Sequence, residues 1–345
     1  MAEVRLTVFQ RMIEKVLYAT NNEFYLRSRD AGASNAQSIK IPQSSGLEEP
    51  VLGGVNSGYF TTSNHLNSAT ALSPVIIVND ELEYSNTIIR PPHPFVLETL
   101  QEAELSYNKA QQLAEEQGMN MKVAIANYFL TVWAQTLAAY IFPTTGLPNP
   151  KKSTTLQSRS TSGTTGAKSG YSGLVKRFEY TDLMALESAI KRQNLEGGQW
   201  FALPTVEIWE DLKRITDIVD YDKTGNETML KQGIVGSWGS IRFLDPRQND
   251  RWNANVAYDI TTPSAPVPIA YGGAFNSNTV SALICWNDRY VERNLGPIKF
   301  FSRKDDPIYM GDIYQWGVRA GGSPRRLDGK GIICVYEDPT TGGAA

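Results

Sequence analysis

The sequence predicts an α+β fold, in which helices mix with short strands that lie far apart along the chain. Three observations lead to this prediction. A helical pattern without Gly or Pro runs from Val96 to Gln117. Short strand patterns dominate the chain after Gly225, and a polar segment rich in Gly, Ser, Asn and Thr, 43–70, separates strand patterns near the N-terminus. No internal repeat is visible.

Composition indicates an ordered globular chain, because 41% of its 345 residues are hydrophobic and 20% are charged. A net charge of -3 argues against a dedicated nucleic-acid binder but not against a container, which holds its contents by confinement. No apolar run reaches the roughly 20 residues that span a bilayer. The N-terminus also lacks the basic start and apolar stretch of a signal peptide. We therefore expect a protein made in the cytoplasm, with no membrane partner.

The N-terminal segment, 1–37, contains an amphipathic helix pattern. Its apolar residues recur at spacings of three and four, at Phe9, Met12, Ile13, Val16 and Leu17. Thr20–Asn22 favours caps and turns and should end the helix. Such a helix docks either on the protein's own core or, as an arm, on a neighbouring subunit. The sequence leaves both interpretations open.

Residues 38–92 are expected to form an extended hairpin. Ser38–Pro42 alternates polar and apolar residues like a strand, and the extended pattern returns at 73–78 and 86–90. So long an excursion with little to bury is unusual inside a compact domain. A two-stranded hairpin needs a partner surface to be stable. Pro91–Pro94 should end the hairpin.

Two helices are expected within 93–141. The first, from Val96 to Gln117, has a narrow apolar stripe among Glu, Gln and Lys, and Gly118 is a natural C-cap. The second, from Met121 to Ala139, is apolar on most sides and belongs in the core.

Beyond residue 141 the chain alternates short elements. A polar loop or small lobe is expected at 142–176, a helix at Ala185–Lys191 and a strand at Trp200–Pro204. Thr205 should cap a helix that continues through Ile215. Later strands are expected at Gly233–Gly236, Ser240–Leu244, Val280–Ile284 and Gly331–Tyr336.

Two motifs resemble ligand-binding loops, but each lacks a residue that such a loop needs. In Ser162–Ser169, Ala167 occupies the position before Lys168 where a phosphate-binding loop needs Gly. Asp220–Gly225 begins like a calcium loop, but Lys231 stands where a bidentate Glu belongs. A flexible loop and a polar turn are the better interpretations. Whether the turn's Asp220 and Asp222 hold an ion stays open.

Catalytic, cofactor-binding and metal-ligating residues are not expected, and we predict that the chain is not an enzyme. The histidines and cysteines, His65, His93, Cys285 and Cys334, lack the short spacing of zinc ligands. Both cysteines lie in apolar strand patterns and should be buried, free thiols. The adjacent carboxylates Glu48–Glu49 and Asp305–Asp306 are typical of a solvated surface.

Several short segments together resemble the major capsid proteins of tailed phages, which have the Hong Kong 97-type fold. These segments are Asn21–Tyr25, Ile39–Gln43, Leu105–Lys109, Trp286–Arg293, Asp306–Asp312 and Gly321–Asp328. The resemblance implies an N-terminal arm at 1–37, an extended hairpin loop at 38–92 that overlaps an adjacent subunit, and a peripheral domain with a spine helix and a core helix at 93–141. It implies an axial domain at 142–285, whose strands return to the peripheral domain, and C-terminal peripheral strands and a tail at 286–345.

The resemblance further implies a structural subunit that self-assembles as pentamers and hexamers into an icosahedral shell around double-stranded DNA. Such a shell is built in the bacterial cytoplasm and becomes the capsid of the virion. Because only 1–37 precedes the hairpin, we expect a separate scaffolding protein, together with a portal and non-specific contact with packaged DNA. Arg293, Arg325 and Arg326 are candidates for contact with DNA or, preferably, with acids of a neighbouring subunit. Lys40 lies in the hairpin, where some members crosslink, but nothing else in the sequence supports a crosslink.

Two alternatives stay open. A protein-loaded nanocompartment, encapsulin-like, would have the same fold and would enclose a cargo enzyme instead of DNA. A monomeric glycan-binding protein or hydrolase would use scattered carboxylates and aromatic residues, among them Trp200, Trp209, Trp238, Trp252, Trp286 and Trp316. Aromatic residues at this frequency are more often core and interface residues.

Overall fold

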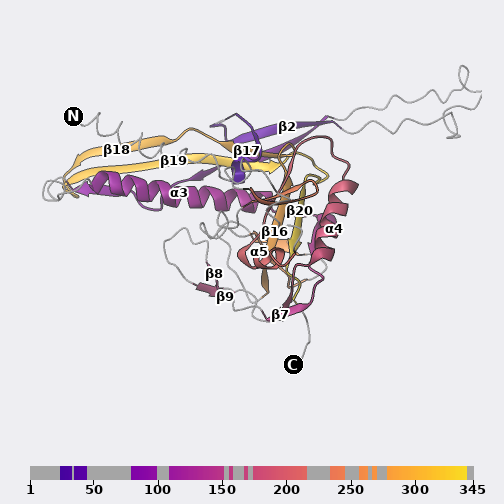
Figure 1. Cartoon of the computed structure of the whole chain (residues 1–345). Helices are drawn as coiled ribbons and strands as arrows, with labels where there is room; N and C mark the ends of the chain where they lie inside the picture. The colour runs from indigo at the N-terminus through magenta and orange to yellow at the C-terminus, as the bar shows by residue number, and fades with distance from the viewer. Residues whose placement is uncertain are drawn as a thin grey trace, which may run out of the picture.

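Two large sheets meet near the C-terminal end of one long helix in the computed structural model (Figure 1). The structure describes residues 24–32, 35–44, 79–98, 109–150, 155–157, 167–169, 174–215, 234–244, 256–262, 266–269 and 278–339. One sheet is a long ribbon that runs beside the helix, and the other forms a more compact body below it. The predicted N-terminal helix at Phe9–Leu17 lies outside the described residues.

The six-stranded sheet, called the ribbon below, is built around β19 (Gly311–Pro324). On one side, β17 (Val291–Leu295) and β18 (Lys299–Asp306) pair with β19 one after the other. Strands β4 (Thr87–Ile89) and β5 (Phe95–Glu98) also pair with β19 one after the other. They lie on its opposite side, because Ala320 pairs with Leu295 of β17 and also with Thr87 of β4. All four strands are antiparallel to β19, and β1 (Arg29–Asp30) joins β17 in parallel.

Helix α3 (Lys109–Trp133) packs along one face of the ribbon (Figure 1). The predicted break at Gly118 is wrong, because this glycine is buried inside one continuous helix. A glycine in a helix interior costs about 1 kcal/mol, which burial of the apolar face outweighs. The predicted start at Val96 is also wrong, since Phe95–Glu98 is strand β5 and pairs with β19.

Gln135 links the end of α3 to the C-terminal part of the chain. Its side-chain Oε1 accepts hydrogen bonds from the backbone N–H groups of Thr136 and Leu137, at 3.0 and 3.1 Å. Its Nε2 donates to the backbone carbonyls of Gly329 and Ile332, at 2.8 and 3.1 Å. Two residues after the helix, the Gln135 side-chain amide is therefore fully used by backbone partners. The short 3₁₀ turn η2 (Ala138–Tyr140) follows.

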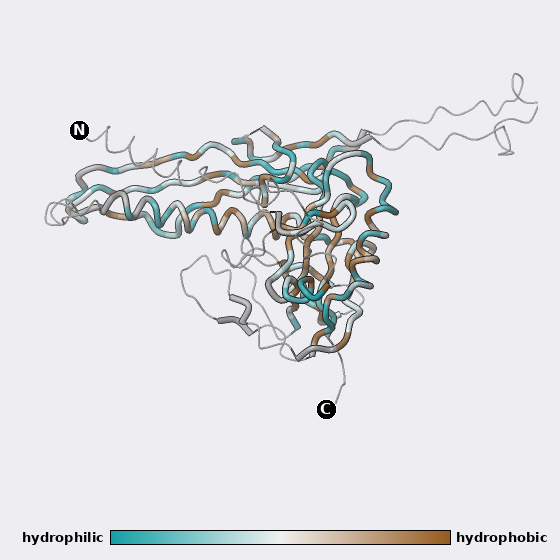
Figure 2. Tube along the Cα trace, in the orientation of Figure 1, coloured by the Kyte–Doolittle hydropathy of each residue, from teal (hydrophilic) through white to brown (hydrophobic). Residues whose placement is uncertain are grey.

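The eight-stranded sheet is organised by β16 (Thr279–Asn287), which is buried along its whole length. It pairs with β11 (Trp200–Leu203), β14 (Val256–Asp259) and β20 (Ile332–Tyr336). The remaining strands are β6 (Ile141–Pro143), β12 (Ile234–Trp238), β13 (Ile241–Leu244) and β15 (Val267–Pro268). A strand buried on both faces reads as an unbroken apolar run, which explains why β16 and β20 were predictable. Figure 2 shows hydrophobic residues gathered in this part of the molecule.

Two helices flank this sheet and agree with the predictions. Helix α4 (Tyr180–Arg192) starts with a capping box between Glu179 and Asp182 and buries Leu183, Leu186 and Ile190. Helix α5 (Val206–Leu212) is capped by Thr205, whose Oγ1 accepts a hydrogen bond from the Ile208 N–H at 3.4 Å. The helix ends at Leu212, earlier than the predicted Ile215. In 142–176, the described residues form two small strand pairs, β7 (Pro148–Pro150) with β10 (Leu174–Lys176) and β8 (Thr155–Gln157) with β9 (Ala167–Ser169).

The predicted hairpin is confirmed for the part that the structure describes. Strand β2 (Ser38–Ser44) pairs with β3 (Asn79–Ser85) in antiparallel register, and this pair projects from the ribbon (Figure 1). The predicted return segment at 73–78 lies outside the described residues and stays a prediction. The predicted return segment at 86–90 is wrong as part of the hairpin, because it contains β4, which belongs to the ribbon. Strand β3 was missed because charged residues alternate with its apolar ones, and only pairing with β2 fixes its conformation.

The C-terminal strands belong to two different sheets. Within 286–345, the strands β17, β18 and β19 belong to the ribbon. Ile332–Tyr336 instead lies between β16 and β6 in the eight-stranded sheet. The chain therefore leaves the ribbon and closes the compact body last.

Cys285 and Cys334 are buried and free, as predicted. They lie on neighbouring strands, but Cys334 pairs with Ile284, so the two thiols point to opposite faces of the sheet. Burial raises the pKa of Cys334 to about 11 and also raises that of Cys285 well above its ordinary value. Both residues are therefore small core residues rather than reactive thiols.

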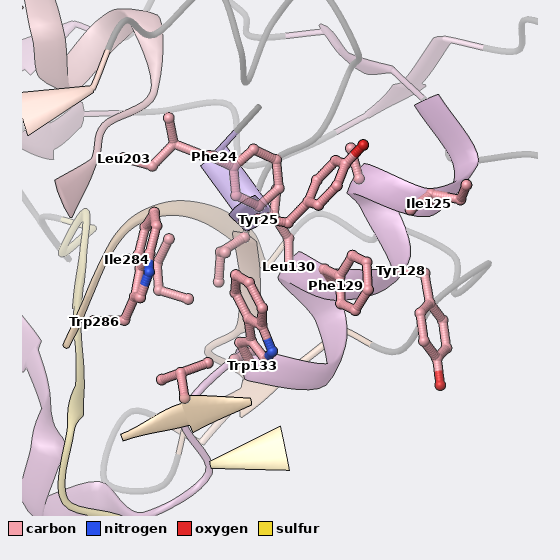
Figure 3. Close-up of a cluster of buried hydrophobic side chains, with 14 of the residues drawn as sticks. Phe24, Tyr25, Ile125, Tyr128, Phe129, Leu130, Trp133, Leu203, Ile284 and Trp286 are labelled. Atoms are coloured by element: carbon pink, nitrogen blue, oxygen red, sulfur yellow. The ribbon is translucent and has the colours of Figure 1, made fainter. Parts of the chain in front are cut away.

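An aromatic cluster joins the two sheets, and we call it the aromatic junction (Figure 3). Phe24, in the 3₁₀ turn η1 (Phe24–Leu26), makes edge contacts with Trp133 of α3 and Trp286 of β16, both with ring centroids 6.2 Å apart. The rings of Trp133 and Trp286 are 5.9 Å apart. The Trp286 Nε1–H also donates to the Arg27 carbonyl at 2.8 Å, which holds the N-terminal turn in place.

Replacing Phe24 with Ala should lower the free energy of unfolding by about 3–5 kcal/mol, because a fully buried ring leaves a cavity between helix and sheet. Urea denaturation of the protein measures this change. Phe301→Ala is the matched control, since that ring is 65% exposed and its loss should cost less than about 0.5 kcal/mol. Equal losses for the two variants would show that the junction does not hold the sheets together.

Candidate functional site

The hairpin stem is the element that the sequence singled out for contacts outside the subunit. Its described strands are joined by an ion pair between Lys40 Nζ and a Glu81 carboxylate oxygen, at 2.6 Å, with both side chains more than half exposed. The hydrogen bond to Glu81 raises the pKa of Lys40. An exposed pair of this kind contributes little to stability, so we infer that the stem gains its stability where it joins the ribbon.

Glu292 of β17 is the centre of that joint. Its carboxylate is only 8% exposed and accepts a hydrogen bond from the Tyr84 hydroxyl of β3 at 3.2 Å. Its other oxygen lies 3.1 Å from Arg325 Nε, just after β19. The Trp133 Nε1–H donates to the Glu292 backbone carbonyl at 3.2 Å. Glu292 therefore connects the hairpin, the ribbon and α3. Burial, followed by the charge of Glu292, raises the pKa of Tyr84, which keeps its hydroxyl protonated as a donor.

Asn86 closes the base of the hairpin on the other side. Its backbone N–H donates to the Gln37 carbonyl at 2.8 Å, and its Nδ2 donates to the Ala36 carbonyl at 2.8 Å. Its Oδ1 lies against Gly321 of β19, where a Cβ atom would come within 1.9 Å of it. Only a glycine allows this approach. The direction of the stem is thus fixed by a buried carboxylate and a close backbone contact.

The arginines predicted to contact DNA or neighbouring acids are all paired within the chain. Arg325 faces Glu292, and Arg293 lies 3.1 Å from Asp30. Arg326 makes a two-nitrogen contact with Asp328, with distances of 2.7–3.2 Å. Contact of these arginines with DNA or with acids of a neighbouring subunit stays a prediction, and sequence spacing did not show that Glu292 and Asp30 lie beside Arg325 and Arg293.

The segment from Asp306 to Asp312 forms the tight turn between β18 and β19, at the end of the ribbon farthest from the compact body (Figure 1). The expected solvated position of Asp306 is wrong, because this carboxylate is buried, accepts a hydrogen bond from the Ile308 N–H at 2.9 Å, and lies 3.1 Å from Arg303. The turn exposes Ile308, Tyr309 and Met310 by 77%, 53% and 68%. Three exposed apolar side chains in one turn are typical of a contact surface between proteins.

The other candidate residues are not brought together. His93 is exposed, and the positions of His65, Glu48–Glu49 and Asp220–Gly225 lie outside the described residues. Ala167–Ser169, from the motif that resembled a phosphate-binding loop, is strand β9. Within the described part of the chain, no three His, Cys, Asp or Glu side chains lie close enough to hold a metal ion. None of its helices is long and apolar enough to cross a membrane.

The five described tryptophans among the glycan-platform candidates do not form a platform on the surface. Trp200, Trp286 and Trp316 are buried, Trp209 and Trp238 are partly buried, and Trp252 lies outside the described residues. The five described ones therefore pack in or against the core, as the more general interpretation of these residues predicted.

No protein-family profile and no curated protein sequence matches the chain. Solved structures do match it. The capsid structure of the Cyanophage P-SCSP1u aligns over 92% of this chain and 89% of its own, with a TM-score of 0.53 and 13% identity. The capsid of Ralstonia phage GP4 aligns over 94% and 93%, with a TM-score of 0.53 and 9% identity. The mature capsid of bacteriophage PhiM1 aligns over 92% and 87%, with a TM-score of 0.52 and 12% identity.

The chain has the phage capsid fold. This confirms the α+β capsid fold predicted from the sequence, and the alignment extends over nearly the full length of both partners. At 9–13% identity the likeness concerns the fold. The sequence did not reveal the roles of Glu292 and Tyr84. The one available signal was Glu292 itself, a charged residue inside the strand pattern Val291–Leu295.

Glu292→Gln should lower the free energy of unfolding by about 2–3 kcal/mol, because the amide can still accept from Tyr84 but loses its charge opposite Arg325. Asp328→Asn makes the same chemical change at the more exposed Arg326 pair and should cost less than about 1 kcal/mol. Chemical denaturation of both variants measures the difference. A Glu292 variant as stable as the Asp328 variant would rule out a structural role for the buried carboxylate.

Proposed function

We propose that the protein is a major capsid protein, a structural subunit that assembles as pentamers and hexamers into an icosahedral shell around double-stranded DNA. The observation that carries this proposal is the alignment with phage capsid chains over about nine tenths of each partner. No separate catalytic domain is needed to account for the described fold. The proposed role is mechanical, and it requires no chemistry at any one site.

The architecture supports a division of labour among the segments. The strands β2 and β3 project from the ribbon, and the predicted hairpin loop would overlap an adjacent subunit, which would satisfy the backbone groups at its strand edges. The ribbon and α3 would form the peripheral domain, and the eight-stranded body, including β20, would form the axial domain around symmetry axes. The segment at 1–37 would act as an arm. Contacts of this kind, repeated by symmetry, close into a shell.

The proposal includes partners and a place of assembly. Subunits would assemble in the cytoplasm of a host bacterium, with a separate scaffolding protein and a portal, and the finished shell would be the capsid of the virion. Contact with DNA would be non-specific. The exposed apolar turn at Ile308, Tyr309 and Met310 fits an interface between subunits.

Electron microscopy of the expressed protein, alone and with its scaffolding protein, tests this function. Uniform closed shells that protect DNA from nuclease are the expected result. Shells filled with a cargo enzyme and free of DNA would instead establish a nanocompartment. A protein that stays monomeric under both conditions would contradict the assembly function.

Deleting 45–70 from the hairpin should leave a soluble, folded subunit that forms few closed shells. The deletion leaves β2 and β3, their junction with Glu292, and the connecting residues 71–78, so the fold itself keeps its contacts. Circular dichroism and size-exclusion chromatography check the fold, and electron microscopy counts the shells. Normal shells from the deletion variant would show that the hairpin does not hold neighbouring subunits together.

A further inference from the structure

The face of the ribbon opposite α3 has a distinct set of side chains. Along β19 the residues alternate, and Tyr314, Trp316 and Val318 are buried, the last two in the core cluster that contains residues of α3. The intervening positions, Ile313, Gln315, Gly317 and Arg319, therefore point to the other face. Register carries this alternation to the neighbouring strands, so Lys299 and Phe301 of β18 and Ile88 of β4 share the outward face.

Three cations surround Gly317 on this face. Lys299 is its direct partner on β18. A Cβ atom placed on Gly317 would lie 3.5 Å from the Cβ of Arg90 and 3.8 Å from a methyl group of Ile88, so both flank the glycine on the side where its side chain would be. Arg319 follows two residues later on the same face. Because Gly317 has no side chain, the surface between Arg90, Lys299 and Arg319 is shallow. We call these three cations and the shallow area between them the Gly317 basic surface.

The charges of this surface are not neutralised within the described chain. Arg90 and Lys299 are exposed, and neither forms an ion pair with a described acid. Arg319 uses one nitrogen, NH1, to donate to the Asn35 carbonyl at 3.0 Å and keeps its charge. Among the described outward positions of β4, β18 and β19 beside Gly317, none is acidic. In contrast, Arg293, Arg325 and Arg326 all face carboxylates.

Three like charges held together in a protein of net charge -3 indicate an anionic partner. Lysine and arginine side chains on a shallow surface suit phosphate groups, which they bind without reading sequence. Ile88 and Phe301 border the surface and are 57% and 65% exposed, so no described part of the subunit covers it. A shallow, open site accepts a smooth polyanion more readily than it accepts a single small anion, which is normally enclosed.

We propose that the Gly317 basic surface binds phosphate groups of double-stranded DNA, and that this face of the ribbon lines the interior of the shell. This inference rests on the proposed function, since it assigns the packaged DNA to one face of the subunit. Acidic side chains of a neighbouring subunit are the competing partner, and the test separates the two.

The test compares two triple variants of the unassembled subunit. One replaces Arg90, Lys299 and Arg319 with Gln. The matched control replaces three exposed cations of the eight-stranded body, Arg192, Lys213 and Arg214, with Gln, so the change in net charge is the same. Fluorescence anisotropy with a labelled 30-base-pair duplex, at several NaCl concentrations, gives the affinity and its salt dependence. Size-exclusion chromatography and circular dichroism confirm that both variants fold.

The variant that lacks Arg90, Lys299 and Arg319 should bind the duplex about tenfold or more weakly than the control. Its salt slope should be smaller by about 2–3, because up to three phosphate contacts are lost. Equal affinity and slope in the two variants would overturn the inference. If the variant that lacks Arg90, Lys299 and Arg319 binds DNA normally but, unlike the control, forms no shells, the inference is overturned in favour of a contact between subunits. Either result leaves the capsid proposal standing, which fails only if the unaltered protein forms no shells.

Discussion

The contact on which the rest of the structure depends is the aromatic junction of Phe24, Trp133 and Trp286. Each ring comes from a different part of the chain, namely the N-terminal turn, the end of α3 and the long strand β16. The three rings lie within one buried cluster that contains residues of the ribbon, of α3 and of the eight-stranded sheet. Aromatic pairs contribute about 0.5–1.5 kcal/mol each beyond the area they bury. The junction thus gives a single relative orientation to two sheets that were built independently.

A second constraint acts at the base of the hairpin, where polar contacts replace apolar ones. Glu292 is buried with Tyr84 and Arg325 around it, and removing any one of them leaves the others without part of their partner set. Buried polar groups of this kind define one geometry, because a shifted hairpin would leave them unsatisfied. The aromatic junction therefore stabilises the packing of the two sheets, and the polar contacts of Glu292 specify the direction of the hairpin. Both act on the same short stretch of chain around β17.

The sequence predicted those elements whose stability is local or whose burial is complete. Strands β11, β16 and β20 read as apolar runs, and Thr205 marked the start of α5 as a cap should. The sequence did not predict the elements whose conformation depends on contacts with distant parts of the chain. Gly118 looked like a helix end because local propensity carries no information on the ribbon that packs on α3. Strand β3 looked polar because its partner is β2 and not the core. At the candidate site, the arginines of 293, 325 and 326 were recognised as partners for acids, but only the fold identifies those acids.

The length of the ribbon has a mechanical consequence. Its longest strand, β19, has 14 residues, which corresponds to about 48 Å from the compact body to the exposed turn at Ile308–Met310. If a rigid ribbon of that length rotates by about 5° at its base, its tip is displaced by roughly 4 Å. Curvature of a closed surface is set by small angles repeated many times. In the proposed shell, side chains packed at the base of the ribbon would therefore determine where its tip meets a neighbouring copy and, through that contact, the radius of the assembly.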